Sequence, residues 1–263
     1  MTHVLETSEL IYGYDANPVV QGFNLRVEKG ERIGIVGPNG SGKSTVLRML
    51  ARLLVPRSGE VFLDGQNMAQ IPTKAIARRL TMLAQSRDAM LEMTVRDLVR
   101  RGRNPFLKWY EECRGVHEII VDWAIRVTGL ADLQHRSLAE LSGGERQRAW
   151  LAMCMAQTPT ILLLDEPTTY LDIAHQLELM ELVRKLNAEN GVTVVMVLHD
   201  LNQAARYCSR IIAVKEGAVV RDGSPREVFQ PDFFREVFGV EAEVWLDDGV
   251  PVFLPKGLAP AGA

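Results

Sequence analysis

The sequence predicts an α/β fold with a mostly parallel sheet, an antiparallel β subdomain and an inserted α-helical subdomain. Short continuous apolar runs predict the parallel strands, because such strands are covered on both faces. Strict alternation of apolar and polar residues predicts half-buried antiparallel strands. Residues 88–155 have helical periodicity and no convincing strand. The four continuous apolar runs are residues 32–36, 160–164, 192–198 and 211–214.

Local patterns predict the other elements. Residues 23–28 (FNLRVE) alternate, and residues 59–65 form a second alternating run that ends in Asp-Gly. Gly191 is placed to end a helix as a C-cap. Near the C-terminus, residues 244–246 and 250–254 can pair as a hairpin. The predicted helices are residues 44–54, 95–101, 117–128, 145–156 and 173–190.

These patterns divide the chain into three parts. We expect an α/β core of residues 1–87 and 156–240, a helical subdomain of residues 88–155 and a short tail of residues 241–263. A chain of 263 residues is long enough to bury a substantial core in such an arrangement.

Composition limits the classes of function. The chain carries a formal net charge of −3 and contains 47% hydrophobic and 24% charged residues, as is usual for soluble globular proteins. The net charge gives no electrostatic case for nucleic acid as the main partner. The three cysteines, Cys113, Cys154 and Cys208, show no paired spacing. We therefore expect a reducing compartment and neither a disulfide framework nor a zinc site.

Neither end of the chain nor its interior predicts a membrane span. The N-terminus lacks the basic-then-apolar pattern of a signal peptide. The longest apolar run, residues 192–198, is far shorter than the roughly 20 residues that a membrane-spanning helix needs. We expect a cytosolic protein unless a partner holds it at a membrane.

Residues 37–45 (GPNGSGKST) match the phosphate-loop pattern G-x-x-x-x-G-K-[ST] between a predicted strand and a predicted helix. Glycines let consecutive backbone N–H groups turn toward a phosphate, and the helix N-terminus adds its dipole. Lys43 would reach the β- and γ-phosphates, and the hydroxyl of Ser44 would bind Mg²⁺. The competing interpretation is a glycine-rich turn without a ligand. The expected nucleotide-binding residues here are Gly37, Pro38, Asn39, Gly40, Ser41, Gly42, Lys43, Ser44 and Thr45.

Two carboxylates, Asp165 and Glu166, follow the apolar run at residues 160–164. Ligands of parallel sheets lie beyond the carboxyl ends of the strands. Asp165 could hold Mg²⁺ there, and Glu166 could polarise an attacking water. The competing interpretation is a pair of solvated acids at a strand end.

Residues 141–145 (LSGGE) open the predicted helix at 145–156. Ser142 and Glu145 have the spacing of a capping box, which is a structural role. A helix N-terminus with two glycines is also a bare anion site, so the two roles are compatible.

The three motifs, in this order, resemble those of the nucleotide-binding subunit of ABC transporters over nearly the whole chain. The resemblance implies a phosphate-loop nucleotide-binding core with an inserted helical subdomain, and ATP and Mg²⁺ as ligands. The family signature is usually LSGGQ, and this chain has Glu145 in place of the Gln. The resemblance implies that Ser142, Gly143 and Gly144 bind a nucleotide held by the partner's phosphate loop.

The resemblance assigns further residues. Gln85 matches the Q-loop, which links Mg²⁺ and water to a membrane partner; without the family it reads as a surface glutamine. His199 matches the switch histidine that contacts the γ-phosphate; alone it reads as a core histidine. Asp172 matches the D-loop at the dimer seam. Tyr14 lies where the family stacks an aromatic ring on adenine, and Tyr12 is the competing candidate.

Within the family, the chain is most similar to the ATPases of iron-siderophore importers. The resemblance implies a homodimer that holds ATP between two copies, beneath polytopic permease subunits and fed by a substrate-binding protein. It places the chain at the cytoplasmic face of the inner membrane as a peripheral protein, with no nucleic-acid partner. The matching stretches are residues 84–85, 99–105, 146–150, 165–176 and 198–204.

Two alternatives stay open at this point. Haem and cobalamin importers share much of the same sequence. A soluble ABC-type ATPase of iron–sulfur assembly or DNA repair is an alternative of another class, although the chain has no long coiled-coil insertion and no zinc-type cysteine pattern.

Overall fold

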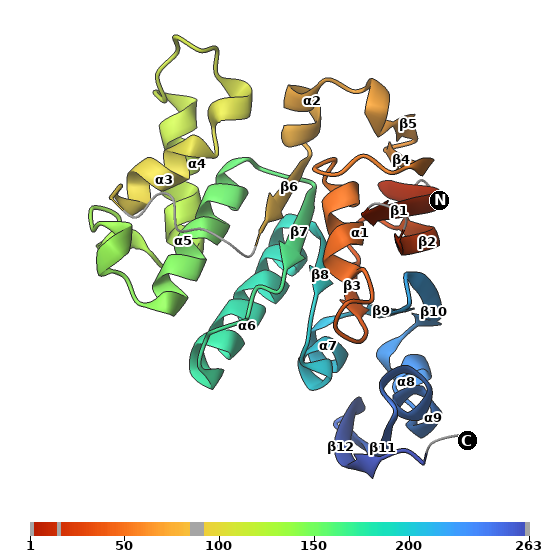
Figure 1. The fold of residues 1–263 in the computed structure, drawn as a ribbon. Helices are drawn as coiled ribbons and strands as arrows, with labels where there is room; N and C mark the ends of the chain where they lie inside the picture. The colour runs from red at the N-terminus through yellow and green to blue at the C-terminus, as the bar shows by residue number, and fades with distance from the viewer. Residues whose placement is uncertain (1–2, 15–16, 85–91, 261–263) are drawn as a thin grey trace. The chain divides into compact units, whose positions relative to one another are not determined.

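The computed structural model describes residues 3–14, 17–84 and 92–260 (Figure 1). The chain forms two compact units, Met1–Gln70 with Val194–Ala263 and Ile71–Thr193. The predicted helical subdomain, residues 88–155, falls entirely within the second unit, and its boundaries stay a prediction.

The first unit contains a four-stranded antiparallel sheet. Its strands are ordered β2-β1-β4-β5, and Leu5 pairs with Val27 on one side and Leu63 on the other. All three of these side chains are fully buried, as alternation requires. The predicted alternating strands are confirmed as parts of this sheet. Its strands are β1 (Leu5–Tyr14), β2 (Asn17–Val27), β4 (Ser58–Leu63) and β5 (Gln66–Asn67).

A second group of strands in this unit is mainly parallel. Strand β3 (Arg32–Val36) has β8 (Thr193–Val197) and β9 (Arg210–Lys215) as parallel neighbours. Strand β10 (Ala218–Gly223) runs antiparallel to β9. The central residues of β3, β8 and β9 are buried, so the continuous apolar runs correctly predicted them.

Helix α1 (Lys43–Leu50) follows β3 and ends four residues before the predicted end at residue 54. Arg52 adopts the left-handed conformation (φ 55°). The N–H of Arg52 donates to Met49 O and the N–H of Leu53 donates to Arg48 O. These two bonds form a Schellman motif, which ends the helix although Leu53 and Leu54 continue its apolar pattern.

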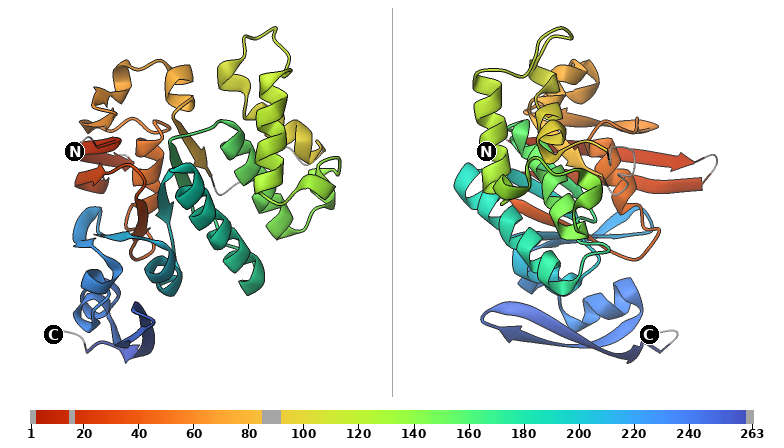
Figure 2. Two further views of the ribbon diagram at one scale, coloured as in Figure 1. Left: turned by 180° about the vertical axis from the view of Figure 1, so that it is seen from behind. Right: turned by 90° about the vertical axis from the view of Figure 1, so that its left-hand side faces the viewer.

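The C-terminal part of the first unit packs around phenylalanines. Phe233 and Phe234 are buried, and the ring of Phe234 stacks on Phe253 at 4.5 Å between centroids. The predicted hairpin is confirmed and is longer than predicted (Figure 2). The elements are α7 (Leu201–Tyr207), α8 (Pro225–Val228), α9 (Pro231–Phe233), a π-helical turn (Phe234–Phe238), β11 (Val240–Asp247) and β12 (Val250–Leu258).

The second unit combines two parallel strands with helices. Strands β6 and β7 pair in parallel, and helices α3, α4 and α5 pack against one another (Figure 2). The predicted helices are confirmed, and Gly191 is a left-handed C-cap of α6. The elements are α2 (Thr73–Ala77), β6 (Leu80–Leu83), α3 (Val95–Arg101), α4 (Val116–Val127), α5 (Gly143–Ala156), β7 (Ile161–Asp165), α6 (Ile173–Asn190) and 3-10 turns at Asn104–Phe106, Ala131–Leu133 and Leu138–Glu140.

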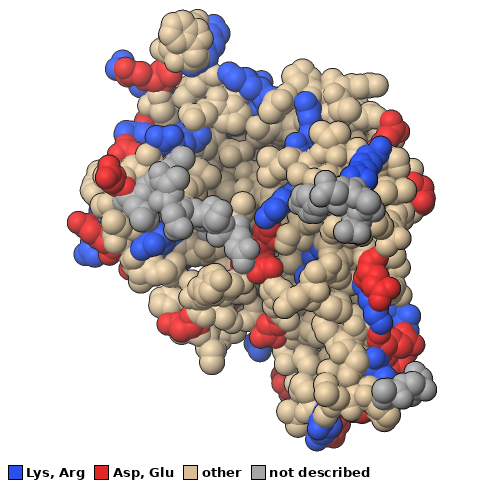
Figure 3. All heavy atoms as spheres, viewed as in Figure 1, with Lys and Arg blue, Asp and Glu red and all other residues tan. Residues whose placement is uncertain are grey.

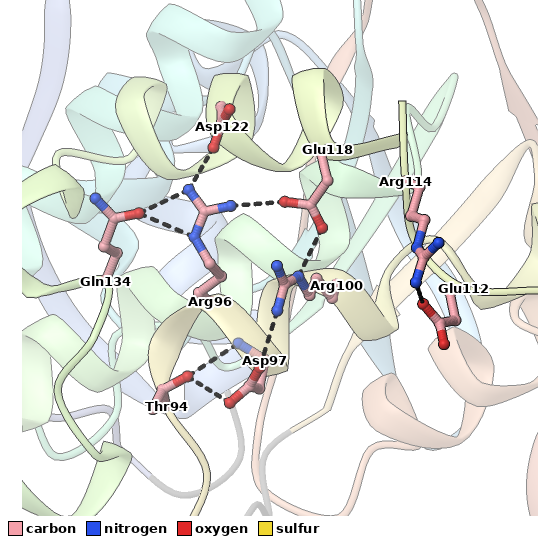
Figure 4. A network of polar contacts seen from close by, with 9 residues as sticks. All are labelled: Thr94, Arg96, Asp97, Arg100, Glu112, Arg114, Glu118, Asp122 and Gln134. Carbon is pink, nitrogen blue, oxygen red and sulfur yellow. Dashed lines mark hydrogen bonds and ion pairs between the residues drawn. The ribbon is translucent and has the colours of Figure 1, made fainter. Parts of the chain in front are cut away.

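Charged side chains join α3 to α4 (Figure 4). Arg96 donates to Glu118 at 2.7 Å and also bonds to Asp122 and Gln134. Arg100 donates to the same Glu118 at 2.7 Å. The Arg96 side chain is only 20% exposed, so the network is more protected from solvent than an ordinary surface ion pair.

We expect Arg96→Met to lower the free energy of unfolding by about 1–3 kcal/mol, because several charged and polar groups of the network lose a partner. Denaturant unfolding measures the effect. Arg184→Met is the matched control, since Arg184 is 54% exposed and pairs with Glu181 within α6. That change should cost less than about 0.5 kcal/mol. Equal losses for both variants would show that the network adds no more than a surface pair.

Candidate functional site

The loop between β3 and α1 has a shape that only glycine permits at two positions. Gly37 has a φ of 147° and Gly42 a φ of 96°. A Cβ atom on Gly37 would lie 2.0 Å from Val214 O, and one on Gly42 would lie 2.6 Å from Val19 O. Neighbouring backbone therefore holds this loop in place before any ligand binds.

Polar groups of the loop converge at the start of α1. Lys43 is 5% exposed, and its Nζ donates to Gly37 O at 2.9 Å and Pro38 O at 2.8 Å. The buried Oγ of Ser41 has no hydrogen-bond partner within the described part of the chain. A cation and an unused hydroxyl beside a helix N-terminus fit a phosphate group. Ser44 and Thr45 follow in the first turn of α1, and both are half-buried.

His199 lies in the same unit as the phosphate loop. It comes two residues after the end of β8 and is exposed. The N–H of Leu198 donates to Ile35 O at 3.2 Å, so the carboxyl end of β8 lies beside that of β3, which leads into the loop. Asp200 caps α7 by accepting from the N–H groups of Asn202 and Gln203.

The two tyrosine candidates are not separated by the structure. Tyr14 is the last residue of β1, and its side chain lies outside the described part of the structure. Tyr12 lies in the same strand and is half-buried. The assignment of Tyr14 to adenine stays a prediction. Gln85 also lies outside the described residues.

Asp165 and Glu166 belong to the second unit. Asp165 ends β7 and is 1% exposed. Glu166 adopts the left-handed conformation (φ 50°), which is rare for a residue with a long side chain. Its carboxylate accepts from Thr169 Oγ1 at 3.3 Å. The half-buried carboxylate of Glu166 thus has a hydroxyl neighbour that helps to fix its orientation.

The LSGGE segment forms the predicted capping box. The N–H of Glu145 donates to Ser142 Oγ at 3.2 Å, and the N–H of Ser142 donates to the Glu145 carboxylate at 2.8 Å. The bond from the Ser142 N–H lowers the pKa of Glu145. Gly143 is exposed at the helix N-terminus and Gly144 is buried. Glu145 thus stabilises the helix start without covering Gly143.

The second unit brings the signature helix α5 to the segment between β7 and α6. Gln147 Nε2 donates to Pro167 O at 2.7 Å. Asp172 caps α6 by accepting from the N–H of His175 at 2.9 Å, and this bond lowers the pKa of Asp172. Helix α5, which begins after the Ser142 cap, is therefore joined to the segment that leads to Asp172 by a contact within this unit.

Two residues that position these motifs were not predicted from the sequence, Gln147 and His175. The contact of Gln147 joins α5 to Pro167 in the segment after β7, and no local pattern reveals it. The spacing of Asp172 and His175 is that of a helix cap with its third residue, and this local signal could have predicted the bond between them.

Charge is mixed on the molecular face drawn in Figure 3, where Lys and Arg side chains alternate with Asp and Glu rather than gathering in a field of one sign. Among the described residues, no helix has both the length and the apolar composition that a bilayer span requires.

Known proteins resemble this chain over nearly its full length. The petrobactin import ATP-binding protein FpuC of Bacillus anthracis is 44% identical over 98% of this chain and 95% of the relative. The ferric enterobactin transport ATP-binding protein FepC of Escherichia coli is 43% identical over 98% of this chain and 97% of the relative.

A solved structure shares the fold. The ATP-binding cassette MJ0796, a dimer in a post-hydrolysis state bound to ADP and Pi, has a TM-score of 0.72 at 30% identity over 84% of this chain and 98% of the cassette. Residues 20–169 match the ABC transporter family model, and they include the phosphate loop, the signature residues and both carboxylates. The chain belongs to the ABC transporter family, as an ATP-binding subunit with ATPase activity.

Proposed function

We propose that this chain binds ATP between two copies of itself, and that hydrolysis there energises a membrane importer for ferric siderophores. The geometry of the phosphate loop is the main support for the ATP site, because neighbouring backbone and two hydrogen bonds hold its glycines and Lys43 in a shape that suits a phosphate. The importer assignment is supported by full-length likeness to petrobactin and ferric enterobactin import ATPases. The pairing of two copies is supported by the dimeric cassette bound to ADP and Pi.

The phosphate loop holds the triphosphate of ATP in this proposal. Its backbone N–H groups and Lys43 balance charge on the transferring phosphoryl group, and His199 contacts the γ-phosphate. The partner subunit's Ser142 and Gly144 reach the same phosphate across the dimer, beside its Asp172. Tyr14 stacks on the adenine. This division explains why a single copy carries both a phosphate loop and a glycine-rich helix start.

In this proposal Mg²⁺ would be held by the hydroxyl of Ser44, the carboxylate of Asp165 and the side-chain carbonyl of Gln85, which are oxygen donors of the kind that Mg²⁺ prefers. Bound Mg²⁺ would neutralise phosphate charge during transfer. Glu166 acts as the base that polarises the attacking water. The hydrogen bond from Thr169 helps to aim the Glu166 carboxylate.

In this proposal the segment after Gln85, through about Tyr110, provides the docking surface for a polytopic permease. Trp109 is 95% exposed and Tyr110 is 62% exposed, and their rings meet edge to face at 5.5 Å. Large exposed aromatic side chains are typical of contact sites. The chain would therefore lie at the cytoplasmic face of the membrane as a peripheral subunit, and a substrate-binding protein would deliver cargo from the other side.

A pull-down from native membranes in a mild detergent tests the proposal. We expect a polytopic permease to co-purify in comparable amount, and its binding protein can then be screened against ferric siderophores, haem and cobalamin. A second pull-down uses a bait with Trp109→Ser and Tyr110→Ser. It should recover less permease than the native bait. Recovery of soluble partners alone would contradict the importer assignment. A binding protein selective for haem or cobalamin would change the proposed cargo.

A further inference from the structure

The imidazole ring of His175 lies directly against the backbone of Gly144. A Cβ atom on Gly144 would lie 2.2 Å from His175 Cδ2 and 2.6 Å from its Cγ, so no side chain fits there while the ring stays. Gly143 differs, since a Cβ there would have only one neighbour within 4 Å, the Cδ2 of Leu171 at 3.7 Å. The buried glycine of the signature segment is therefore the one that His175 contacts.

The same side chain also contacts Asp172. Nδ1 of His175 lies 2.8 Å from Asp172 Oδ1, and the backbone N–H of His175 donates to that oxygen at 2.9 Å. The ring thus spans the distance between the start of α5 and the cap of α6. Its side chain is 32% exposed, so it is partly buried at the surface of the unit.

We propose that His175 is a positioning residue that holds Gly144 and Asp172 at a fixed spacing, so that both motifs of one subunit meet the second copy as a single preformed surface. This inference rests on the proposed function, because it assumes that the two motifs act together across an ATP-bound dimer. Nothing in this role requires His175 to touch the nucleotide.

Other contacts already hold the segment between Pro167 and Leu171, so the ring of His175 has a separate role. Gln147 Nε2 holds Pro167 O at 2.7 Å and Gln176 Nε2 holds Leu171 O at 2.9 Å, so both ends of the segment 167–171 are tied by backbone-directed bonds. His175 links the side chain of Asp172 to the backbone of Gly144. Loss of that link should leave the fold intact and add an ordering cost to dimer formation, which preformed surfaces avoid.

A series of substitutions separates the two contacts. Asn retains Cγ and an amide nitrogen near the position of Nδ1, so His175→Asn preserves both contacts. His175→Leu retains packing on Gly144 and loses the bond to Asp172, and His175→Ala loses both. Each variant is made in a Glu166→Gln background, in which ATP-driven dimers should accumulate. His135→Ala, at an exposed histidine of the same unit, is the control.

We expect His175→Ala to raise the ATP concentration for half-maximal dimerisation about tenfold, His175→Leu to raise it less, and His175→Asn and His135→Ala to leave it within about twofold. The dissociation constant for ATP on the monomer should stay unchanged in all four, because the phosphate loop belongs to the first unit. In the chain with native Glu166, the test is made at protein concentrations so low that few subunits are paired. The rate then follows the fraction of dimer, so His175→Ala should lower the apparent kcat. The apparent KM for ATP follows binding to the monomer and should stay nearly unchanged. A merely structural role would not produce this split or the rescue by Asn.

Dimerisation of His175→Ala at the ATP concentration of its parent would overturn the inference and leave the proposed function standing. Failure of the Glu166→Gln parent to dimerise, together with no ATP hydrolysis by the native chain, would overturn both. If His175→Ala does not fold, His175→Leu carries the test. A second measurement addresses the contact itself: Gly144→Ala should destabilise the chain less when combined with His175→Ala, and additive losses would exclude the contact.

Discussion

Glu166→Gln should bind ATP, form a stable dimer and hydrolyse ATP about 10²–10⁴-fold more slowly than the native chain. The glutamine has the size of the native side chain and can still accept a hydrogen bond from Thr169, so the geometry beyond β7 is retained. It cannot accept a proton from water. The loss therefore falls on the chemical step, while binding is spared. Single-turnover hydrolysis measures the rate, and size-exclusion chromatography with ATP measures dimer formation.

Thr169→Val tests how much of the rate of ATP hydrolysis depends on the orientation of the Glu166 carboxylate. It removes the 3.3 Å bond to Glu166 and keeps the carboxylate, so the rate should fall far less than in Glu166→Gln. Near-native turnover by Glu166→Gln would assign the base to another group. A Glu166→Gln protein that no longer binds ATP would place the residue in nucleotide binding rather than in catalysis.

Lys43→Ala should raise the dissociation constant for ATP by about 10–150-fold, which corresponds to the loss of charge-assisted hydrogen bonds worth about 1.5–3 kcal/mol. Lys43 supplies the positive charge at the phosphate loop and also donates to Gly37 O and Pro38 O. Its removal therefore weakens the ligand contact and loosens the loop. Calorimetric titration with ATP measures the change.

Lys43→Met separates these two contributions, because methionine fills the buried space and carries no charge. Its dissociation constant should lie close to that of Lys43→Ala if charge dominates. Lys185→Ala, at an exposed lysine of α6, removes one positive charge elsewhere and should leave the dissociation constant unchanged. An unchanged value in Lys43→Ala would contradict the phosphate-loop assignment.

The sequence predicted the strands and long helices because their periodicity reflects burial directly. It did not predict where α1 ends. Leu53 and Leu54 extend the apolar pattern, but the helix ends before them at the left-handed turn of Arg52. An arginine in the sequence does not indicate a left-handed conformation. The short turns between Pro225 and Phe238 were also missed, because their stability comes from a phenylalanine cluster assembled with β12.

The site motifs were predictable for a different reason: each depends on a local backbone geometry that leaves a sequence signature. Glycines at Gly37 and Gly42 and the capping pair of Ser142 and Glu145 are of this kind. The contact of His175 with Gly144 is not, since it joins residues on two helices that are 31 positions apart in the sequence. Only packing brings them together.

The left-handed backbone at Glu166 has a consequence for the energy of the folded chain. A non-glycine residue in this conformation costs about 1–2 kcal/mol relative to the right-handed region. Glycine would relieve that strain, so at the position of the proposed base the best residue for folding and the best residue for the proposed chemistry differ. The chain carries this local instability at Glu166, and the buried strand β7 that precedes it, ending in Asp165 at 1% exposure, provides the rigid support that lets it persist.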